Sequence, residues 1–301
     1  MRKDDFIVHL RTFEGGLEKA NSDGIVSPAY HIFHGKNTDT RFFYPFFRSK
    51  YFIDALLKPH VYGIRDGKSI DIEGMKTISF LVPSFEEQNK IGKFVETLDN
   101  TITLQQRKLN SLQKLKKGLL QKMFPKKGEN IPEIRFPKFS DAWKQRKLGD
   151  VCKEFKSGKN ITANMIYPSG KYPVFGGNGI RGFSSTFNHD GDFALIGRQG
   201  ALCGNISWSS GKAFFTEHAV AVQADEEQAD TRFMYYQLGI MNLGQYSGQS
   251  AQPGLAVNKI IKLESSFPSK EEQHKIGSFF TQLDHTITLQ QRWLFYTHKQ
   301  S

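Results

Sequence analysis

The stretch Val174–Gly182 carries two polar side chains in a setting that fits recognition rather than catalysis. Four glycines surround Asn178 and Arg181. A phosphate-binding loop would need a strand, the pattern G-x-G-x-x-G and a helix, or a Lys-Ser/Thr pair after the second glycine, and this stretch has neither. Glycines also let a backbone approach a nucleic-acid groove closely, where Asn and Arg side chains reach the edges of bases. An ordinary turn is the competing interpretation.

A second short loop, Ile196–Gly200, offers the same kind of chemistry. It places Arg198 and Gln199 between two glycines after an expected strand. Arginine commonly binds guanine, and glutamine binds adenine, through paired hydrogen bonds, although an arginine in a structural ion pair is equally ordinary. We therefore predict contacts to DNA by Asn178, Arg181, Arg198, Gln199 and Lys212.

Residues suited to catalysis or metal binding form no recognisable motif. The nine histidines show neither H-E-x-x-H nor another ligand pairing, and Glu217-His218 stands without a nucleophile motif. There is no Asn-Pro-Pro methylation motif, no Walker A motif and no nuclease cluster of the P-D…E-x-K type. Cys152 and Cys203 have no pairing or metal spacing and are expected to be reduced and structural. The sequence thus predicts no catalytic residue, no metal site and no cofactor in this chain.

The elements that position these loops belong to an internal duplication. Residues 83–109 and 268–294 are identical at 19 of 27 positions, at an offset of 185, and such a repeat must be recognised before any other pattern. The tetrapeptide DTRF, which begins at Asp39 and again at Asp230, extends the duplication upstream. Nothing in the first copy corresponds to residues 143–189, so we expect the first copy to be trimmed on its N-terminal side.

Each repeated stretch predicts a long helix. S-x-x-E capping boxes begin both helices, at Ser84 and at Ser269, and Pro125 ends the first helix near Met123. Behind each cap, apolar residues alternate at spacings of four and three, which is a heptad seam that Lys116 interrupts on the first helix. Two matching seams predict an antiparallel coiled coil, and two separate core helices are the alternative. The expected interface, between the helices or to a partner, contains Ile91, Leu98, Ile102, Gln105, Leu109, Leu112, Ile276, Leu283, Ile287 and Gln290.

The sequence divides into five segments. Residues 1–82 form a partial β-rich unit, 83–125 the first helix, 126–147 a basic linker, 148–267 a complete β-rich unit and 268–301 a shorter second helix. Strands are expected at Phe6–Leu10, His31–Phe33, Ile78–Val82, Tyr172–Phe175, Asp192–Gly197, Ala213–Gln223 and Lys259–Phe267, and further helices around Phe42–Leu57 and Thr231–Leu243. The expected fold class is therefore α+β.

The positive charge is concentrated in one region. The net charge of the chain is +11, and residues 107–147 hold 13 Lys or Arg against 3 acidic residues. Such a density is typical of polyanion binding, so Lys114, Lys117, Lys126 and Lys127 are predicted to meet DNA phosphates; a solvated coiled-coil flank explains the charge equally well. No apolar run approaches the ~20 residues of a membrane span, and the N-terminus lacks a signal-peptide pattern, which predicts a cytoplasmic protein without membrane contact.

Taken together, these motifs resemble a known family. The two capped helices with EEQ-x-K-I and LD-x-T-I-x-LQQR, the tetrapeptide Ser27-Pro-Ala-Tyr30, and a linker with Pro132–Phe136, Trp143 and Leu148-Gly-Asp150 are similar to the specificity subunit of type I restriction–modification systems. The resemblance covers nearly all of the chain. It implies that the β-rich units are target-recognition domains, each reading half of a bipartite DNA site. It also implies that the helices set the separation of the half-sites and dock methyltransferase subunits.

The resemblance places catalysis and cofactors in other subunits. It implies double-stranded DNA, methyltransferase subunits and a restriction subunit as partners, with S-adenosylmethionine, ATP and Mg²⁺ bound by those subunits, so that this chain is a non-catalytic subunit. We also expect self-association, or a second specificity polypeptide, because a second helix about two turns shorter than the first would leave Leu112, Leu119 and Met123 exposed. The alternatives are a truncated or phase-variable product that acts only with a second chain, and a coiled-coil scaffold without base readout.

Overall fold

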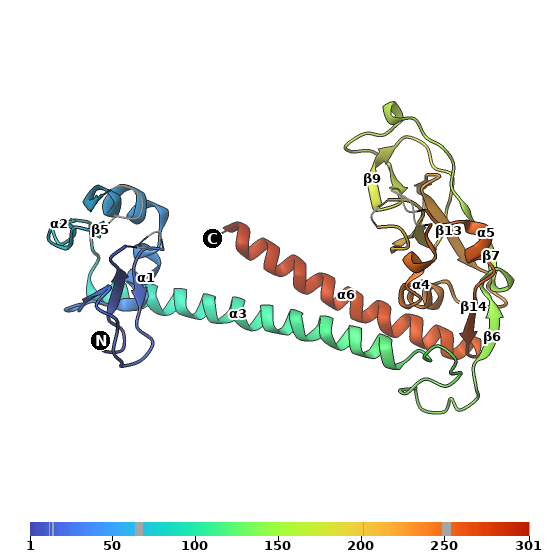
Figure 1. The fold of residues 1–301 in the computed structure, drawn as a ribbon, viewed down its shortest axis with the longest axis horizontal. Coiled ribbons are helices and arrows are strands. Elements are labelled where there is room, and N and C mark those ends of the chain that lie inside the picture. Colours follow the sequence, from blue (N-terminus) through green and yellow to red (C-terminus); the bar gives the residue numbers. More distant parts are fainter. Residues whose placement is uncertain (12, 14, 64–68, 201, 249–253, 301) are drawn as a thin grey trace. The chain divides into compact units, whose positions relative to one another are not determined.

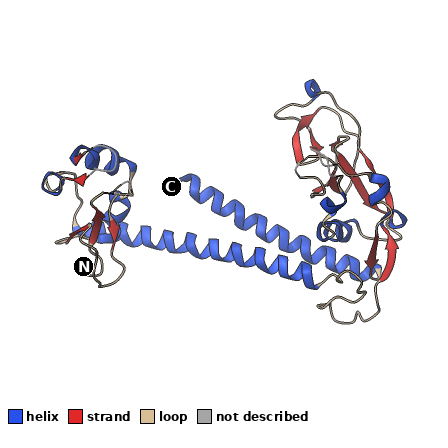
Figure 2. Ribbon diagram, viewed as in Figure 1, coloured by secondary structure: helices blue, strands red, loops and turns tan. Residues whose placement is uncertain are grey.

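The chain forms two compact units. The computed structural model describes residues 1–11, 13, 15–63, 69–200, 202–248 and 254–300. The first unit comprises Met1–Arg107 and the second Lys108–Ser301, and the boundary falls inside one helix, α3 (Phe85–Lys122). Both units contain strands together with helices (Figure 2), which confirms the α+β class.

A three-stranded antiparallel sheet of order β2-β1-β3 lies at the centre of the first unit. Its core is aromatic: Phe6, Phe43 and Phe52 are buried, and Phe43 stacks on Phe47 with ring centroids 5.6 Å apart. The elements are β1 Phe6–His9, β2 Glu18–Lys19, β3 Tyr30–Phe33, α1 Thr40–Phe47, the π-helix Phe52–Leu57, the 3-10 helix Lys58–His60, β4 Val61–Tyr62, β5 Ser69–Ile70 and α2 Ile72–Met75.

The second unit is built on a four-stranded antiparallel sheet, β11-β10-β13-β7, with a three-stranded sheet, β12-β8-β9, and a ribbon, β14-β6, beside it. All five residues of β10 are buried, because its faces contact both the helices and the smaller sheet's aromatic residues. The elements are β6 Lys144–Lys147, β7 Cys152–Ser157, β8 Tyr172–Gly176, β9 Gly179–Ser184, β10 Phe193–Gly197, β11 Ile206–Ser209, β12 Phe214–Phe215, β13 Ala219–Ala224, α4 Thr231–Ile240, α5 Val257–Ile260, β14 Glu264–Phe267, α6 Lys270–Gln300 and the 3-10 turns Leu148–Val151, Ala163–Met165 and Leu243–Tyr246.

A buried glutamine fixes the start of α3 to helix α1. Gln88 accepts a hydrogen bond from the amide of Asp39 (3.1 Å) and donates one to the carbonyl of Pro83 (2.9 Å). Asp39 is also the N-cap of α1. At Gly92 the helices are so close that a Cβ would lie 3.0 Å from Asp39 and from the backbone of α1. A side chain at position 92 would therefore push the two helices apart.

The second unit contains the same junction. Gln273 accepts a hydrogen bond from the amide of Asp230 (3.1 Å) and donates one to the carbonyl of Pro268 (3.0 Å), and Asp230 caps α4. A Cβ on Gly277 would lie 3.0 Å from the backbone of α4. The duplication found in the sequence is thus a duplication of three-dimensional structure.

Within the second unit, residues 108–122 of α3 pack against α6 with opposite chain direction (Figure 1). Residues near the end of α3, including Leu119, join the core that contains Ile276 near the start of α6. One turn earlier, Lys116 forms an ion pair with Asp284 (2.5 Å). Lys116 interrupts the apolar seam because its charge meets a carboxylate on the facing helix, and its ammonium lies 5.6 Å from the centre of the Tyr236 ring.

The predicted strand Ile78–Val82 is wrong: these residues form no regular element. Their counterpart in the second unit is β14, which is a strand because it pairs with β6. The prediction at Lys259–Phe267 was partly wrong for a related reason, since only Glu264–Phe267 is extended and Val257–Ile260 is helical. Apolar residues allow a segment to be extended, but it becomes a strand only where a partner strand pairs with it.

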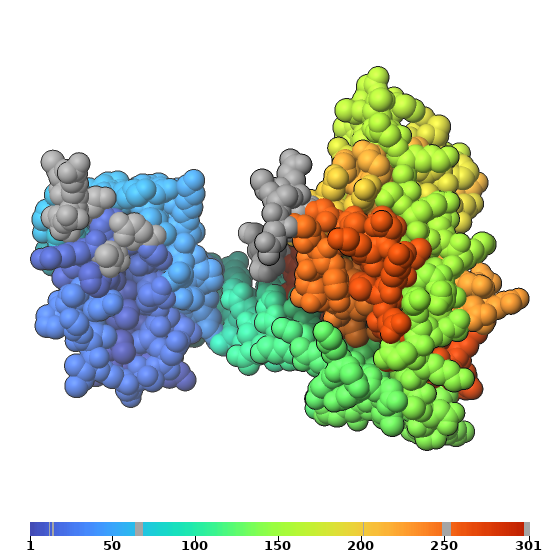
Figure 3. All heavy atoms as spheres, turned by 45° about the vertical axis from the view of Figure 1, so that its right-hand side comes forward, coloured from blue at the N-terminus to red at the C-terminus, as the bar shows by residue number. Residues whose placement is uncertain are grey.

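The interpretation of residues 126–147 as a basic linker without a regular element also needs correction. Trp143 is buried beside Phe124 and Phe233, and Lys144–Lys147 is strand β6. Charged residues form this strand because it is an edge strand whose side chains are mostly exposed. In Figure 3 the green residues that follow α3 lie beside orange residues of the C-terminal part of the chain. Part of the segment therefore belongs to the core of the second unit.

The expected exposed strip at the end of α3 is wrong as well. Met123 is 4% exposed and Leu119 packs against the core of the second unit, because the start of α6 and the residues after α3 cover them. Most exposed apolar residues of α3 lie on its earlier part, at Ile91, Phe94, Leu98 and Leu104, and Leu115 is exposed nearer its end.

Candidate nucleic-acid interface

The glycine-rich stretch is a hairpin. β8 and β9 are joined by the two-residue turn Gly177-Asn178, with Gly176 opposite Gly179. Asn178 is exposed at the tip, and Gly179 has a φ of 91°, a conformation that favours glycine. The competing interpretation as a turn is thus correct for the backbone, and the turn presents the Asn178 side chain to solvent.

Arg181 extends from β9 across the neighbouring strand. A Cβ on Gly176 would lie 2.4 Å from Cδ of Arg181, so the glycine leaves the space in which the arginine stem lies. The Arg181 side chain is exposed. No carboxylate of the described residues lies within ion-pair distance of it. Its charge is available to an external group.

The second predicted loop lies directly against the hairpin tip. A Cβ on Gly197 would lie 2.2 Å from the carbonyl oxygen of Gly177, and a Cβ on Gly177 would lie 3.2 Å from that of Gln199. Glycine at position 197 is required for this approach, and a side chain at position 177 would be tightly crowded. The fold therefore brings the stretch with Asn178 and the stretch with Arg198 and Gln199, which are 20 residues apart in the sequence, to one end of the second unit.

Arg198 is held in place through neutral groups. Its guanidinium lies 3.4 Å from Oγ of Ser157 and 3.5 Å from the carbonyl oxygen of Glu217, and its amide donates to the carbonyl of His218 at 2.9 Å. The ion pair that was the alternative role for Arg198 does not occur among the described residues. Gln199 is exposed beside it.

Sequence reasoning did not identify the residues that surround Arg198. Glu217 and His218 form a pair at 3.2 Å, and their backbone carbonyls, rather than a catalytic arrangement, position Arg198. Ser157 ends strand β7 and became a neighbour only through the sheet. The adjacent residues Glu217 and His218 were the one signal in the sequence, and they suggested a catalytic pair rather than a support for Arg198.

Lys212 is not brought to this cluster. Its ammonium lies 4.8 Å from the centre of the Phe187 ring, in a loop bonded to residues 189–191 at the start of β10. Arg198 follows the other end of β10, and five strand residues span about 16 Å. Lys212 and Arg198 therefore lie at opposite ends of the strand.

The predicted phosphate-contacting lysines lie along and beyond α3. Lys114 and Lys117 are exposed on the helix, and Lys126 and Lys127 are exposed just after it. None of the four takes part in the ion pairs of the described residues, whereas neighbouring Lys122 pairs with Glu133 at 2.6 Å. The four lysines remain candidates for phosphate contact.

The predicted helix–helix residues fall into two groups. Leu109, Ile276 and Ile287 are buried, and Leu112 and Leu283 are half-buried, in the second unit. Ile102, Gln105 and Gln290 are half-buried, while Ile91 is 38% and Leu98 is 41% exposed.

A family model described as "Type I restriction modification DNA specificity domain" matches residues 21–114 and 140–294. The chain belongs to this family. The type I restriction enzyme EcoprrI specificity subunit of Escherichia coli is 42% identical over 149 residues, which are 48% of this chain and 36% of that subunit. The match thus spans about a third of that relative's length.

Solved structures of specificity subunits have a similar fold. The S subunit of a type I restriction–modification system from M. genitalium matches with a TM-score of 0.68 at 17% identity, over 98% of this chain and 80% of that one. A chain from a structural study of complex assembly and conformational transition of the type I R-M system matches with a TM-score of 0.53 at 17% identity, over 100% of this chain and 79% of that one. These matches extend over both units of the duplication.

The described part of this specificity-family chain contains no group of three or more His, Cys, Asp or Glu placed to hold a metal ion. Among the same residues, no helix has the length and apolarity needed to cross a membrane. Both cysteines are free, and burial raises the pKa of the Cys152 thiol to about 12. A thiol with such a raised pKa is a weak nucleophile at neutral pH.

Proposed function

We propose that this chain is the DNA-recognition component of a type I restriction–modification complex and directs methyltransferase and restriction subunits to a bipartite site. The supporting observation is the family match to both copies of the duplication, residues 21–114 and 140–294. Two related units, each attached to its own capped helix, suit the reading of two half-sites. The joined loops carrying Asn178, Arg198 and Gln199 are the proposed base-reading surface of the second unit.

In this proposal the chain supplies recognition and its partners supply chemistry. Arg181 and Arg198 would contact base edges, while Lys114, Lys117, Lys126 and Lys127 would contact phosphates. S-adenosylmethionine, ATP and Mg²⁺ would be bound by the methyltransferase and restriction subunits. The chain alone is accordingly expected neither to cut nor to methylate DNA.

The test is the methylation pattern that the chain directs. Expression with its methyltransferase subunits in a host lacking other methylases, followed by methylome sequencing, should reveal one interrupted motif. The variant R198A/Q199A should change one half of that motif and leave the other half unchanged. Methylation without a motif, or a motif indifferent to these substitutions, would contradict the proposal.

Two copies of the chain are proposed to act together. Ile91, Phe94, Leu98 and Leu104 are exposed apolar residues on one helix, and apolar groups in such number favour association. A two-fold pair would read an interrupted palindrome, since protein symmetry imposes site symmetry. Light scattering of the complex gives the copy number. A single copy that directs methylation of an asymmetric site would exclude this arrangement.

A further inference from the structure

The short helices α2 and α5 occupy the same place in the duplication and fold alike. At the offset of 185 that relates the long helices, residues 71–78 correspond to residues 256–263. Four amide-to-carbonyl hydrogen bonds recur at that offset. They are Met75 to Asp71, Lys76 to Ile72, Thr77 to Gly74 and Ile78 to Met75 in the first unit, and Ile260 to Ala256, Ile261 to Val257, Lys262 to Lys259 and Leu263 to Ile260 in the second. The two segments therefore have the same local backbone.

In the second unit this segment is covered by residues 143–157. The amide of Leu148 donates to the carbonyl of Leu263, and the amide of Gly149 donates to the carbonyl of Ile261, each at 2.9 Å. Strand β6, just before Leu148, pairs with β14. Residues 143–157 thus satisfy the backbone groups of residues 261–267.

In the first unit the corresponding groups have no such neighbour. The carbonyls that match those of Ile261 and Leu263 belong to Lys76 and Ile78, and no described residue donates a hydrogen bond to either one. Residues 79–82, which match β14, pair with no strand of the described chain. Leu81, within them, is 102% exposed.

The sheet of the first unit lacks a strand at the same side. Its order, β2-β1-β3, matches β11-β10-β13 of the second unit, where β7 continues the sheet beyond β13. Residues 143–157 provide β7 as well as β6. No described strand pairs with the outer edge of β3, and an unpaired edge is a template for another strand.

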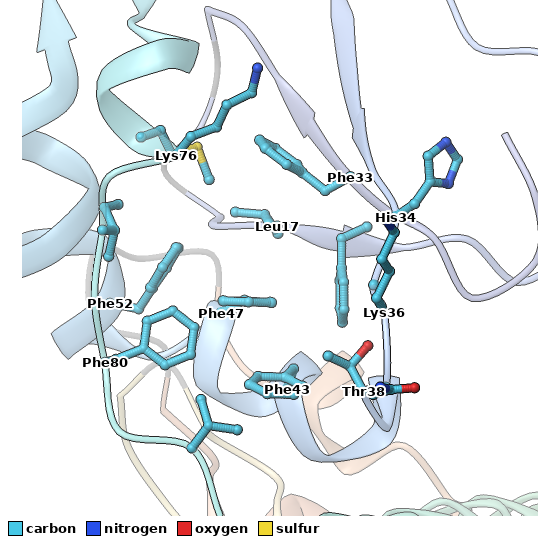
Figure 4. Close-up of a pocket in the computed structure, with 16 residues that line it drawn as sticks. Leu17, Phe33, His34, Lys36, Thr38, Phe43, Phe47, Phe52, Lys76 and Phe80 are labelled. Carbon is cyan, nitrogen blue, oxygen red and sulfur yellow. The ribbon is translucent and has the colours of Figure 1, made fainter. Parts of the chain in front are cut away.

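An apolar pocket of about 500 Å³ lies between these unpaired elements. In Figure 4 the side chains of Leu17, Phe43, Phe47 and Phe80 gather around it. Ile78, whose carbonyl accepts no described hydrogen bond, also lines the pocket.

The matching space in the second unit is filled. At the offset of 191 given by the DTRF repeat, Phe43 and Phe47 correspond to Met234 and Leu238. Both are fully buried in a core that also contains Leu148 and Val151, each 0% exposed. The side chains of residues 143–157 therefore occupy the region that is open in the first unit.

We propose that the first unit is a binding site for an extended segment of another polypeptide with the pattern of Trp143–Phe155. Its amides would bond to the carbonyls of Lys76 and Ile78, its strand would extend the sheet at β3, and an apolar pair spaced as Leu148 and Val151 would enter the pocket. Addition of a strand to an unpaired edge, with side chains in pockets, is an established mode of peptide recognition.

Charge favours the same occupant. Lys36 and Lys76 line the pocket and are exposed. Lys76 forms an exposed ion pair with Glu73 at 2.6 Å, which a carboxylate of the occupant would share or replace. In the second unit the amide of Gly149 donates to the carbonyl of Ile261, and Asp150 is the next residue. Ile261 corresponds to Lys76 in the repeat. An acidic residue at the position of Asp150 would therefore lie beside Lys76. This inference holds whether or not the chain recognises DNA.

The test uses the full chain and a fluorescein-labelled peptide of residues 141–158 as the probe. Fluorescence anisotropy should show saturable binding of one peptide per chain. The peptide L148D/V151D should bind at least about tenfold more weakly, a difference of ~1.4 kcal/mol, because it would place two carboxylates in an apolar pocket. The matched peptide K153A, changed at a residue that is exposed in the second unit, should bind like the parent.

Substitutions in the chain locate the site. I78E should weaken binding at least about tenfold, and I25S, at a residue that is 101% exposed and outside the pocket, should not. A peptide with a photoreactive benzoylphenylalanine at position 148 should cross-link to residues 33–38 or 75–82. Cross-links confined to residues 256–267, equal binding of L148D/V151D, or the absence of saturable binding would each overturn the proposal.

Discussion

The carboxylate of Glu272 accepts two hydrogen bonds from the guanidinium of Arg135, both at 2.7 Å. Glu272 is 0% exposed and the Arg135 side chain 12%, and the hydrogen bonds that Arg135 donates to Glu272 raise the pKa of Arg135. This pair joins the residues that follow α3 to the first turn of α6. The exposed repeat counterpart of Glu272 is Glu87.

Glu272 should therefore contribute far more to stability than Glu87. E272Q removes the charge that compensates a buried guanidinium and is expected to lower the free energy of unfolding by about 3 kcal/mol. E87Q, the matched control, should change it by less than about 0.5 kcal/mol. Urea unfolding followed by circular dichroism measures both values. Equal effects of the two substitutions would show that Arg135 finds other partners.

Arg198 should determine sequence choice rather than general affinity for DNA. R198A is expected to cost about 1–3 kcal/mol on the preferred site and little on random DNA, because its guanidinium is positioned by neutral groups at the exposed end of the second unit. K212A, at the other end of β10, is the matched control and should leave the preference unchanged. Competition binding of the assembled complex to both DNAs distinguishes the two residues, and equal losses on both would make Arg198 structural.

The lysines of α3 should make DNA affinity depend on salt concentration. The double variant K114Q/K117Q is expected to reduce the slope of log affinity against log salt by about 2, if each lysine neutralises one phosphate. K116Q is the contrasting variant: Lys116 pairs with Asp284, so its loss should lower stability and leave the slope unchanged. A titration of DNA binding against salt gives the slopes. An unchanged slope for K114Q/K117Q would place these lysines away from DNA.

Asp39 should make the first unit sensitive to acid. The hydrogen bonds from Arg41 hold the pKa of Asp39 below its ordinary value of 3.8, so the folded state favours the ionised carboxylate. The resulting stabilisation is complete above pH 3.8 and is lost as the pH falls through the folded pKa, because unfolding then takes up a proton. D39N, which keeps a capping side chain, should reduce this acid dependence, and D99N, at an exposed residue of α3, should not. The measurement is the free energy of unfolding between neutral and acidic pH. If D39N kept the full acid dependence, Asp39 would not be its source.

Cys152 should resist alkylation. With its thiol pKa raised to about 12 by burial, the thiolate fraction at pH 8 is about one in ten thousand. Mass spectrometry after brief treatment of the folded chain with iodoacetamide should find Cys152 unmodified, and the same treatment in urea should modify it. Rapid labelling of the folded chain would mean that the core around β7 opens readily.

Local signals were read correctly from the sequence. The long helices depend on capping serines and on the apolar seam, which are encoded within a few residues, and α3 and α6 follow the expected segments. Both capping serines accept the expected amide, Ser84 from Glu87 at 3.3 Å and Ser269 from Glu272 at 3.4 Å. The duplication also predicted that the two units share elements.

Features that depend on distant partners were not readable. Lys144–Lys147 is a strand because of β14, some 120 residues away, and Ile78–Val82 is not a strand because no such partner is present among the described residues. At the candidate interface, the sequence identified both glycine-rich loops. It could not show that Gly177 contacts Gly197, or that Lys212 lies at the far end of β10.

The burial of Trp143 between Phe124 and Phe233 gives the second unit an optical signal of its own. All three tryptophans of the chain, at 143, 208 and 293, belong to that unit, and the first unit contains only Phe and Tyr as aromatic chromophores. Selective excitation of indole therefore follows the melting of the second unit alone, whereas circular dichroism follows both. E272Q should shift the indole transition and D39N should leave it in place. The unfolding of the two units can thus be distinguished in the intact, unlabelled chain.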